Sequence, residues 1–171
     1  MKEMDSLGLK MCKYQADLFE KSADSLGCSS GVFIRRFMNS DLAKRMDNDG
    51  FMFDVLDTTD AFVEIESQYG ASSYGSEKYS HEELYWIGYM YRYWAYVTGL
   101  SSRQIYKETK PGYLKKAYFP YHSLDPMQAI DRIMEEQGKE PEQISDIARG
   151  VEIVRRVRAE LRDKPDKKGR A

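Results

Sequence analysis

The chain is poor in the residues on which most catalytic and metal sites are built. Its 171 residues include only two cysteines and two histidines, and Cys12, Cys28, His81 and His122 do not stand at the spacing of zinc ligands. Neither histidine belongs to an HExxH motif, and the GCSSG segment lacks the lysine of a phosphate-binding loop. The sequence therefore predicts no metal site and no cofactor.

Cysteine usage and the lack of long apolar runs also indicate the compartment. Two thiols cannot form a disulfide framework and fit a reducing environment. The first residues, MKEMDSLGLKMCKY, lack the apolar core of a signal peptide, and no run approaches the ~18 apolar residues of a membrane span. We expect a cytoplasmic protein without a membrane segment.

Charge is nearly balanced overall but unevenly distributed. The chain has 26 basic and 28 acidic residues, for a net charge of −2. The segment from Arg155 to Ala171 alone holds eight basic and three acidic residues. The sequence thus predicts an acidic body with a basic carboxyl end.

A mid-chain aromatic stretch, from Ser80 to Gly99, contains both tryptophans and five tyrosines. Ser80 and Glu83 form the S-x-x-E pattern of a capping box, and Gly99 is suited to the left-handed residue that ends a helix. At helical spacing, apolar and aromatic side chains cover most of the circumference. We predict a helix over 81–98 at the centre of the fold, with other helices around it.

Helical spacing recurs along the rest of the chain, and no segment alternates as a strand would. We predict an all-α fold, a compact multi-helix bundle with an α-helical domain over 1–140, an amphipathic helix over 141–163 and a disordered basic tail over 164–171. Within the domain, the expected helices are 6–26, 29–46 with a break at Ser40-Asp41, 51–55, 58–69, 101–108, 113–118 and 126–137.

A row of side chains on the central helix is the first candidate interface. Tyr85, Tyr89, Arg92 and Tyr96 recur one helical turn apart, and tyrosine and arginine are enriched at binding hot spots. The alternative is that these tyrosines pack inward with their hydroxyls at the boundary. Three basic residues of the carboxyl-terminal helix complete the predicted partner-binding set: Arg155, Arg156 and Arg158.

Residues 98–118 have the outline of a helix-turn-helix, with Pro111 and Gly112 in the turn. DNA binding through this segment or through the basic tail is therefore an alternative. The second helix offers few side chains for reading bases, and an acidic body repels a duplex, so a plain helical hairpin is the competing interpretation. The candidate nucleic-acid contacts are Arg103, Lys107, Lys115 and Lys116.

An enzyme of unrecognised type is the third hypothesis. Carboxylate pairs such as Glu82-Glu83 occupy adjacent helical positions, which point about 100° apart and are typical of a solvated surface. Catalysis would require a deep pocket with polar groups converging on His81 or His122.

Three segments carry a family resemblance: SSGVFIRRFMNSDLAKRMD, YGASSYGSEKYSHEELYWIGYMYRYW and SSRQIYKETKPGYLKKAYFPYHSLDPMQAIDRI. They resemble a group of small bacterial antitoxin or immunity proteins encoded beside ADP-ribosyltransferase-like toxins. The similarity covers about residues 29–138, and YWIGYMYRYW is its most distinctive part. It implies a partner-binding role but assigns no functional residue.

Together, the residues and the resemblance predict a non-enzymatic protein-binding module, an antitoxin-type protein that neutralises a co-encoded toxin. An antitoxin that acts by covering a surface needs no catalytic group, and it often joins a folded body to an extension that orders on binding. The sequence leaves the oligomeric state and the partner's identity open.

Overall fold

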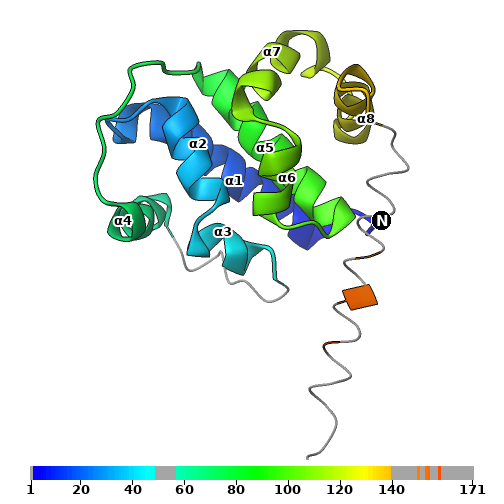
Figure 1. Cartoon of the computed structure of the whole chain (residues 1–171), viewed down its shortest axis with the longest axis horizontal. Coiled ribbons are helices and arrows are strands. Elements are labelled where there is room, and N and C mark those ends of the chain that lie inside the picture. Colours follow the sequence, from blue (N-terminus) through cyan, green and yellow to red (C-terminus); the bar gives the residue numbers. More distant parts are fainter. Residues whose placement is uncertain (1, 49–56, 140–149, 151–152, 155–157, 159–171) are drawn as a thin grey trace, which may run out of the picture.

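The computed structural model describes residues 2–48 and 57–139, together with residues 150, 153, 154 and 158. Over the two continuous ranges the regular secondary structure is entirely helical, which confirms the all-α prediction (Figure 1). The helices are α1 (Ser6–Ser25), α2 (Ser30–Met38), α3 (Asp41–Met46), α4 (Thr58–Tyr69), α5 (His81–Thr98), α6 (Ser102–Glu108), α7 (Pro111–Tyr121) and α8 (Pro126–Glu136).

Helix ends fall where the capping residues are. At the start of α5, the Ser80 side chain accepts from the backbone N–H of Glu83, and the Glu83 carboxylate accepts from the N–H of Ser80. Gly99 ends α5 with φ of 70°, a left-handed conformation that a β-carbon disfavours. Ser40 caps the amino end of α3, where its side chain accepts from the backbone N–H of Ala43. The predicted break at Ser40-Asp41 is therefore confirmed.

The predicted boundaries of α7 were wrong at both ends. The helix begins at Pro111, because the first helical position needs no N–H donor and suits the fixed φ of proline. It also continues through Pro120 to Tyr121. Pro120 lies one residue from the end, where the loss of a single backbone hydrogen bond is tolerated.

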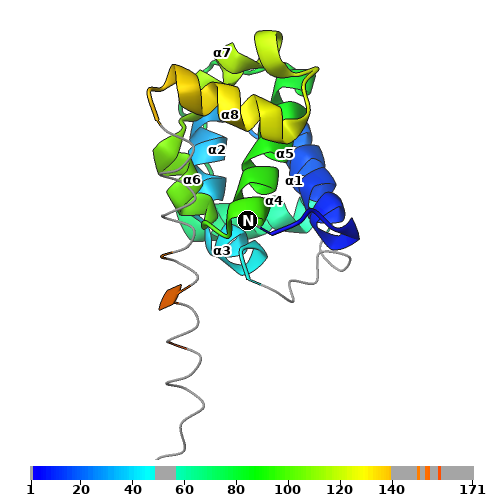
Figure 2. The ribbon, with the colours of Figure 1, turned by 90° about the vertical axis from the view of Figure 1, so that its right-hand side faces the viewer.

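Helix α5 occupies the centre of the bundle, as predicted. Figure 2 shows it between α1 on one side and α6 on the other, with α7 and α8 at one end of the molecule. Helix α1 runs antiparallel along α5: Gly8, near the start of α1, lies against Tyr96, and Gln15, further along α1, lies against Gly88. Gly88 makes this approach possible, since a β-carbon there would lie 2.8 Å from the carbonyl oxygen of Gln15.

The core is aromatic and continuous through α1, α2 and α5. Phe19 packs edge-on against Phe33 and Phe37, with ring centroids 5.3 and 5.0 Å apart. On α5, Tyr91 and Trp94 are fully buried. The hydroxyl of Tyr91 donates to the carbonyl oxygen of Thr109 at 2.7 Å, so even this deep phenol has an acceptor.

Three predicted segments lie outside the described residues: 51–55, the tail over 164–171, and most of the helix over 141–163. Within that helix, residues 150, 153, 154 and 158 are helical. None of the helices in the described ranges combines the length and hydropathy needed to cross a membrane.

Candidate functional site

The predicted row on α5 divides into three surface tyrosines and one interior arginine. Tyr85, Tyr89 and Tyr96 are partly buried. Arg92 is only 2% exposed and lies among the largest buried side chains. Its prediction as a surface contact was therefore wrong, because this position of α5 faces α1 and α6.

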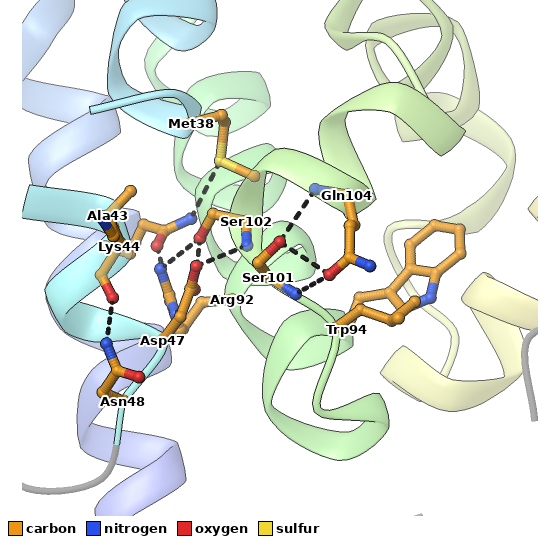
Figure 3. Close-up of polar contacts among 12 residues, drawn as sticks. Met38, Ala43, Lys44, Asp47, Asn48, Arg92, Trp94, Ser101, Ser102 and Gln104 are labelled. Carbon is orange, nitrogen blue, oxygen red and sulfur yellow. Dashed lines mark hydrogen bonds and ion pairs between the residues drawn. The ribbon is translucent and has the colours of Figure 1, made fainter. Parts of the chain in front are cut away.

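Arg92 is the centre of a buried polar network (Figure 3). Its Nε donates to Oε1 of Gln15 at 2.8 Å, its Nη1 to Oδ1 of Asp47 at 2.9 Å, and its Nη2 to Oγ of Ser102 at 2.9 Å. Each nitrogen of the guanidinium thus has an acceptor from a different segment of the chain. The network joins α1, the end of α3, α5 and the start of α6.

Asp47 completes the network, although no motif in the sequence marks it as a candidate. Its Oδ2 accepts from the backbone N–H of Ser102 at 2.8 Å, and its Oδ1 also accepts from the Ser102 hydroxyl at 2.7 Å. The Gln15 amide donates in turn to the carbonyl oxygen of Gly88 at 3.1 Å. Three of the five N–H donors of Arg92 thus have buried acceptors, one on each guanidinium nitrogen, and the network links four segments of the fold.

A larger aromatic group covers the outer side of α5 and the adjoining part of α7, and sequence reasoning identified only part of it. The rings of Tyr89 and Tyr93 stack with centroids 6.2 Å apart. Trp86 meets Tyr118 edge-on at 5.8 Å, and Tyr118 stacks on His122 at 4.7 Å. We call this set the aromatic face: Tyr85, Trp86, Tyr89, Tyr93, Tyr118 and His122.

The phenols of Tyr85, Tyr89 and Tyr93 stay protonated at neutral pH. Burial, with a smaller contribution from Cys12 and neighbouring tyrosines, raises the pKa of Tyr89 to about 12. Burial also raises the pKa of Tyr85, helped by the carboxylates of Asp17 and Glu20, and that of Tyr93, helped by Asp125. These hydroxyls are therefore neutral groups that can donate hydrogen bonds.

Tyr96, at the far end of the row, is already occupied by the amino-terminal segment. Its hydroxyl donates to Oδ1 of Asp5 at 2.7 Å, and Nζ of Lys2 lies 4.1 Å from the ring centroid. The ring thus anchors the residues that lead into α1. Of the predicted row, Tyr85 and Tyr89 remain as candidate contacts, and Trp86 and Tyr93 join them.

The helix-turn-helix outline is present as α6, a two-residue connection and α7. Arg103, Lys107 and Lys116 are exposed on it. Lys115 instead pairs with Glu77, with Nζ 2.8 Å from Oε1, and lies 4.6 Å from the ring centroid of Tyr79. Three of the four predicted nucleic-acid contacts therefore point to solvent, whereas Lys115 holds the loop before α5.

The predicted contacts at the carboxyl end are described only in part. Arg155 and Arg156 lie outside the described residues, and Arg158 is helical and exposed. Ile153 and Val154 are 56% and 49% exposed. Two large apolar side chains of this segment are thus open to solvent.

The histidines and cysteines have separate surroundings in the described part of the chain. His81 lies at the start of α5 with its Nε2 3.4 Å from Oδ2 of Asp24, whereas Nδ1 of His122 is 3.0 Å from the carbonyl oxygen of Tyr118. Cys12 and Cys28 are buried as free thiols. Among the residues that the structure describes, no group of three or more His, Cys, Asp or Glu side chains could hold a metal ion.

The interior position of Arg92 could have been anticipated only with its partners known. A helical projection places Arg92 one turn after Gly88, on the side that packs against α1. Its charge argues for solvent unless a buried carboxylate is available, and Asp47, 45 residues earlier, gives no sequence signal of that pairing.

Comparisons of the chain with protein-family models, with curated proteins and with solved structures gave no significant match.

Proposed function

We propose that this chain is a cytoplasmic, non-enzymatic protein-binding module that neutralises a co-encoded toxin by covering part of its surface. The aromatic face is the observation that carries the proposal. Exposed or partly exposed aromatic side chains gathered over neighbouring helices are typical of protein interfaces, since they supply large rigid contact area at low entropic cost.

Phe119 is a strongly exposed aromatic side chain close to this surface in the chain. It lies on α7 next to Tyr118 and is 85% exposed, more than any other large hydrophobic side chain of the described residues. A phenylalanine in water gains about 1.5–3 kcal/mol when a partner buries it. Phe119 is therefore the side chain we assign to the centre of the contact.

The antitoxin role is supported by the resemblance over residues 29–138 and by the carboxyl-terminal segment. Ile153 and Val154 present apolar area that a partner's groove can accept. The aromatic face and this segment would give the toxin two separate contacts, of which neither needs a reacting group.

Co-expression with the genomic neighbours tests the proposal. We expect one neighbour to co-purify with the chain and to lose its toxicity when the chain is present. Phe119→Ser should weaken the complex about tenfold, as for a hot-spot residue. Val63→Ser, on α4 and 62% exposed, is the matched control and should bind as the wild type does.

Two results would contradict the proposal. One is the absence of any co-purifying neighbour. The other is a neighbour that binds the wild type and the Phe119→Ser variant with equal affinity and stays toxic when the chain is present. Urea unfolding of both variants should give wild-type stability, which excludes misfolding as the cause of lost binding.

DNA binding through α6 and α7 is the second candidate. The exposed Arg103, Lys107 and Lys116 on a helix–turn–helix favour it. It requires retention of a duplex from the upstream region of the operon, with steep salt dependence, and Lys107→Gln with Lys116→Gln should reduce that salt slope. No gel shift at low salt would remove this candidate.

A further inference from the structure

Tyrosine rings in this molecule are repeatedly covered by the chain's own cations. In each case a lysine or arginine lies within the range in which the ring quadrupole attracts a positive charge. Four such pairs occur among the residues that the structure describes, with distances to the ring centroid of 4.1, 5.7, 4.0 and 4.6 Å: Lys2 over Tyr96, Arg36 over Tyr69, Lys110 over Tyr106 and Lys115 over Tyr79.

The tyrosines of the aromatic face are different. Tyr85, Tyr89 and Tyr93 lie within two turns of α5 and are partly buried, and Tyr89 and Tyr93 stack with an interplanar angle of 22°. Within the described ranges, no lysine or arginine lies over any of these three rings. They form a surface of the same chemistry without the cation.

Carboxylates stand on both sides of these rings. Asp17 and Glu20, on α1, act electrostatically on the phenol of Tyr85, and Asp125, at the start of α8, acts on those of Tyr89 and Tyr93. Side chains that raise a phenol pKa in this way also attract a cation above the ring. The pairs at Tyr79 and Tyr96 also include a carboxylate: Glu77 pairs with Lys115, and Asp5 accepts from the Tyr96 hydroxyl.

We propose that Tyr85, Tyr89 and Tyr93 receive an arginine side chain of the partner protein, with Asp17, Glu20 and Asp125 as its counter-charges. That this arginine comes from a partner protein rests on the protein-binding function proposed above. Arginine is favoured over lysine because its planar guanidinium stacks on aromatic faces and loses less hydration. The toxin surface that contacts the aromatic face thus presents an arginine rather than a carboxylate.

A peptide titration tests this surface directly. The probe is acetyl-Gly-Arg-Gly-Arg-Gly-amide, and the control is the same peptide with citrulline, which keeps the shape and lacks the charge. Added to the full chain with isotopically labelled tyrosine, the arginine peptide should shift the ring signals of Tyr85, Tyr89 and Tyr93. The citrulline peptide should bind at least tenfold more weakly, since the cation supplies the attraction.

Paired variants separate the rings from the hydroxyls. Tyr89→Leu with Tyr93→Leu should weaken the arginine peptide about tenfold, because two cation–π contacts are lost. Tyr89→Phe with Tyr93→Phe keeps both rings and should stay within about threefold of the wild type. Tyr69→Leu, on α4 with its ring beside Arg36, is the distant control and should not alter binding.

Equal binding of the arginine and citrulline peptides would overturn the proposal, and so would wild-type affinity in the double leucine variant. If that variant does not fold, Glu20→Gln with Asp125→Asn provides the second test, and unchanged affinity there would overturn it too. A neighbour that co-purifies while the peptide is not bound refutes this inference alone. Peptide binding without any co-purifying neighbour refutes the proposed function and leaves the cation-binding surface standing.

Discussion

Arg92 and Asp47 form an ion pair in the interior, with side chains only 2% and 8% exposed and Nη1 2.9 Å from Oδ1. Removing two charges from water costs several kcal/mol for each ion, which the pair recovers only when further hydrogen bonds satisfy both groups. Gln15 and Ser102 provide those bonds. The four side chains thus behave as one unit.

We predict that Arg92→Met lowers the free energy of unfolding by about 3–5 kcal/mol, because it leaves the Asp47 carboxylate buried without its counter-charge. Urea denaturation followed by circular dichroism measures the change. Arg45→Met is the matched control. It breaks an exposed pair, with Nη2 2.7 Å from Oε2 of Glu64, and should cost less than about 1 kcal/mol.

Combining Arg92→Met with Asp47→Leu removes both charges and should restore part of the lost stability. Additive losses in the double variant would show that the two side chains act independently and that the pairing contributes nothing. Because Arg92 is interior, a loss of partner binding on its replacement would report unfolding rather than a lost contact.

At the scale of helices, Gly88 sets the distance between α1 and α5. A β-carbon at this position would lie 2.8 Å from the carbonyl oxygen of Gln15 and 3.0 Å from Cα of Ala16, both backbone atoms that cannot rotate away. We predict that Gly88→Ala destabilises the protein by about 1–3 kcal/mol, although alanine favours helices by about 1 kcal/mol. Thermal unfolding measures this.

Gly112→Ala provides the comparison within the same fold. Gly112 lies in the first turn of α7, and a β-carbon there would meet no atom within 4 Å. This substitution should leave stability unchanged or raise it by a few tenths of a kcal/mol. A neutral Gly88→Ala would mean that α1 and α5 can separate without cost, against the packing described.

Glu136 ties the end of α8 to α7 through two phenols. Its Oε2 accepts from the hydroxyl of Tyr113 at 2.6 Å, and its Oε1 accepts from that of Tyr121. These bonds lower the pKa of Glu136 below its usual 4.5, and burial with the Glu136 bond raises the pKa of Tyr113 to about 12. The carboxylate form is therefore the one that the folded state prefers.

The stabilisation from Glu136 should be present above the unfolded pKa of 4.5 and disappear as pH falls through the lower folded value. We predict that Glu136→Gln reduces stability at pH 7 and that the difference from the wild type shrinks as the pH falls below the unfolded pKa and through the lowered pKa of the folded state. Urea unfolding of both proteins across this range measures it. A constant difference would show that the carboxylate charge is not involved.

Helix ends were predictable where capping residues and glycines mark them. The ends of α7, which lie at or next to prolines, were not. The boundaries of α4 and α5 follow from Asp57, Ser80 and Gly99, whose side chains or conformations act within one turn. The predicted helix over 113–118 stops short of Pro120 because proline breaks helix interiors, yet near a carboxyl end the same residue costs little. The aromatic face joins α5 to α7, and local periodicity carries no signal for such contacts.

Across the whole molecule, the two thiols report on global opening. Cys12 is fully buried between α1 and α5, and burial raises its pKa to about 12. Cys28 is 4% exposed. We predict that neither thiol reacts with a disulfide reagent at pH 8 in the folded protein, and that labelling proceeds only through unfolding.

Labelling kinetics check this prediction. The rate should rise with urea in step with the unfolded fraction, and it should be faster in Gly88→Ala than in Gly112→Ala. Prompt labelling of one thiol in native buffer would reveal local opening, of α1 for Cys12 or of the connection between α1 and α2 for Cys28. The same reaction in denaturant, with both thiols available, gives the reference amplitude.

The fold class was predictable from the sequence, but the packing of particular helices against one another was not. Apolar periodicity and the aromatic helix predict a bundle around 81–98, which the structure confirms. Which helix lies against which face depends on contacts such as Gln15 with Arg92 and Tyr96 with Asp5, whose partners are 77 and 91 residues apart in the chain. Those pairings determine which side of α5 is left for the aromatic face.

The antiparallel contact of α1 with α5 has a consequence for how the protein is made. A chain leaving the ribosome releases α1 first, but its packing partner is complete only when residue 98 has been synthesised. Until then Phe19, Phe33 and Phe37 have no α5 to cover them, so nascent chains expose this aromatic surface to chaperones. Because it closes so large a loop, the docking of α1 on α5 should be slower than the packing of α6 and α7 onto α5, which they follow directly in the chain.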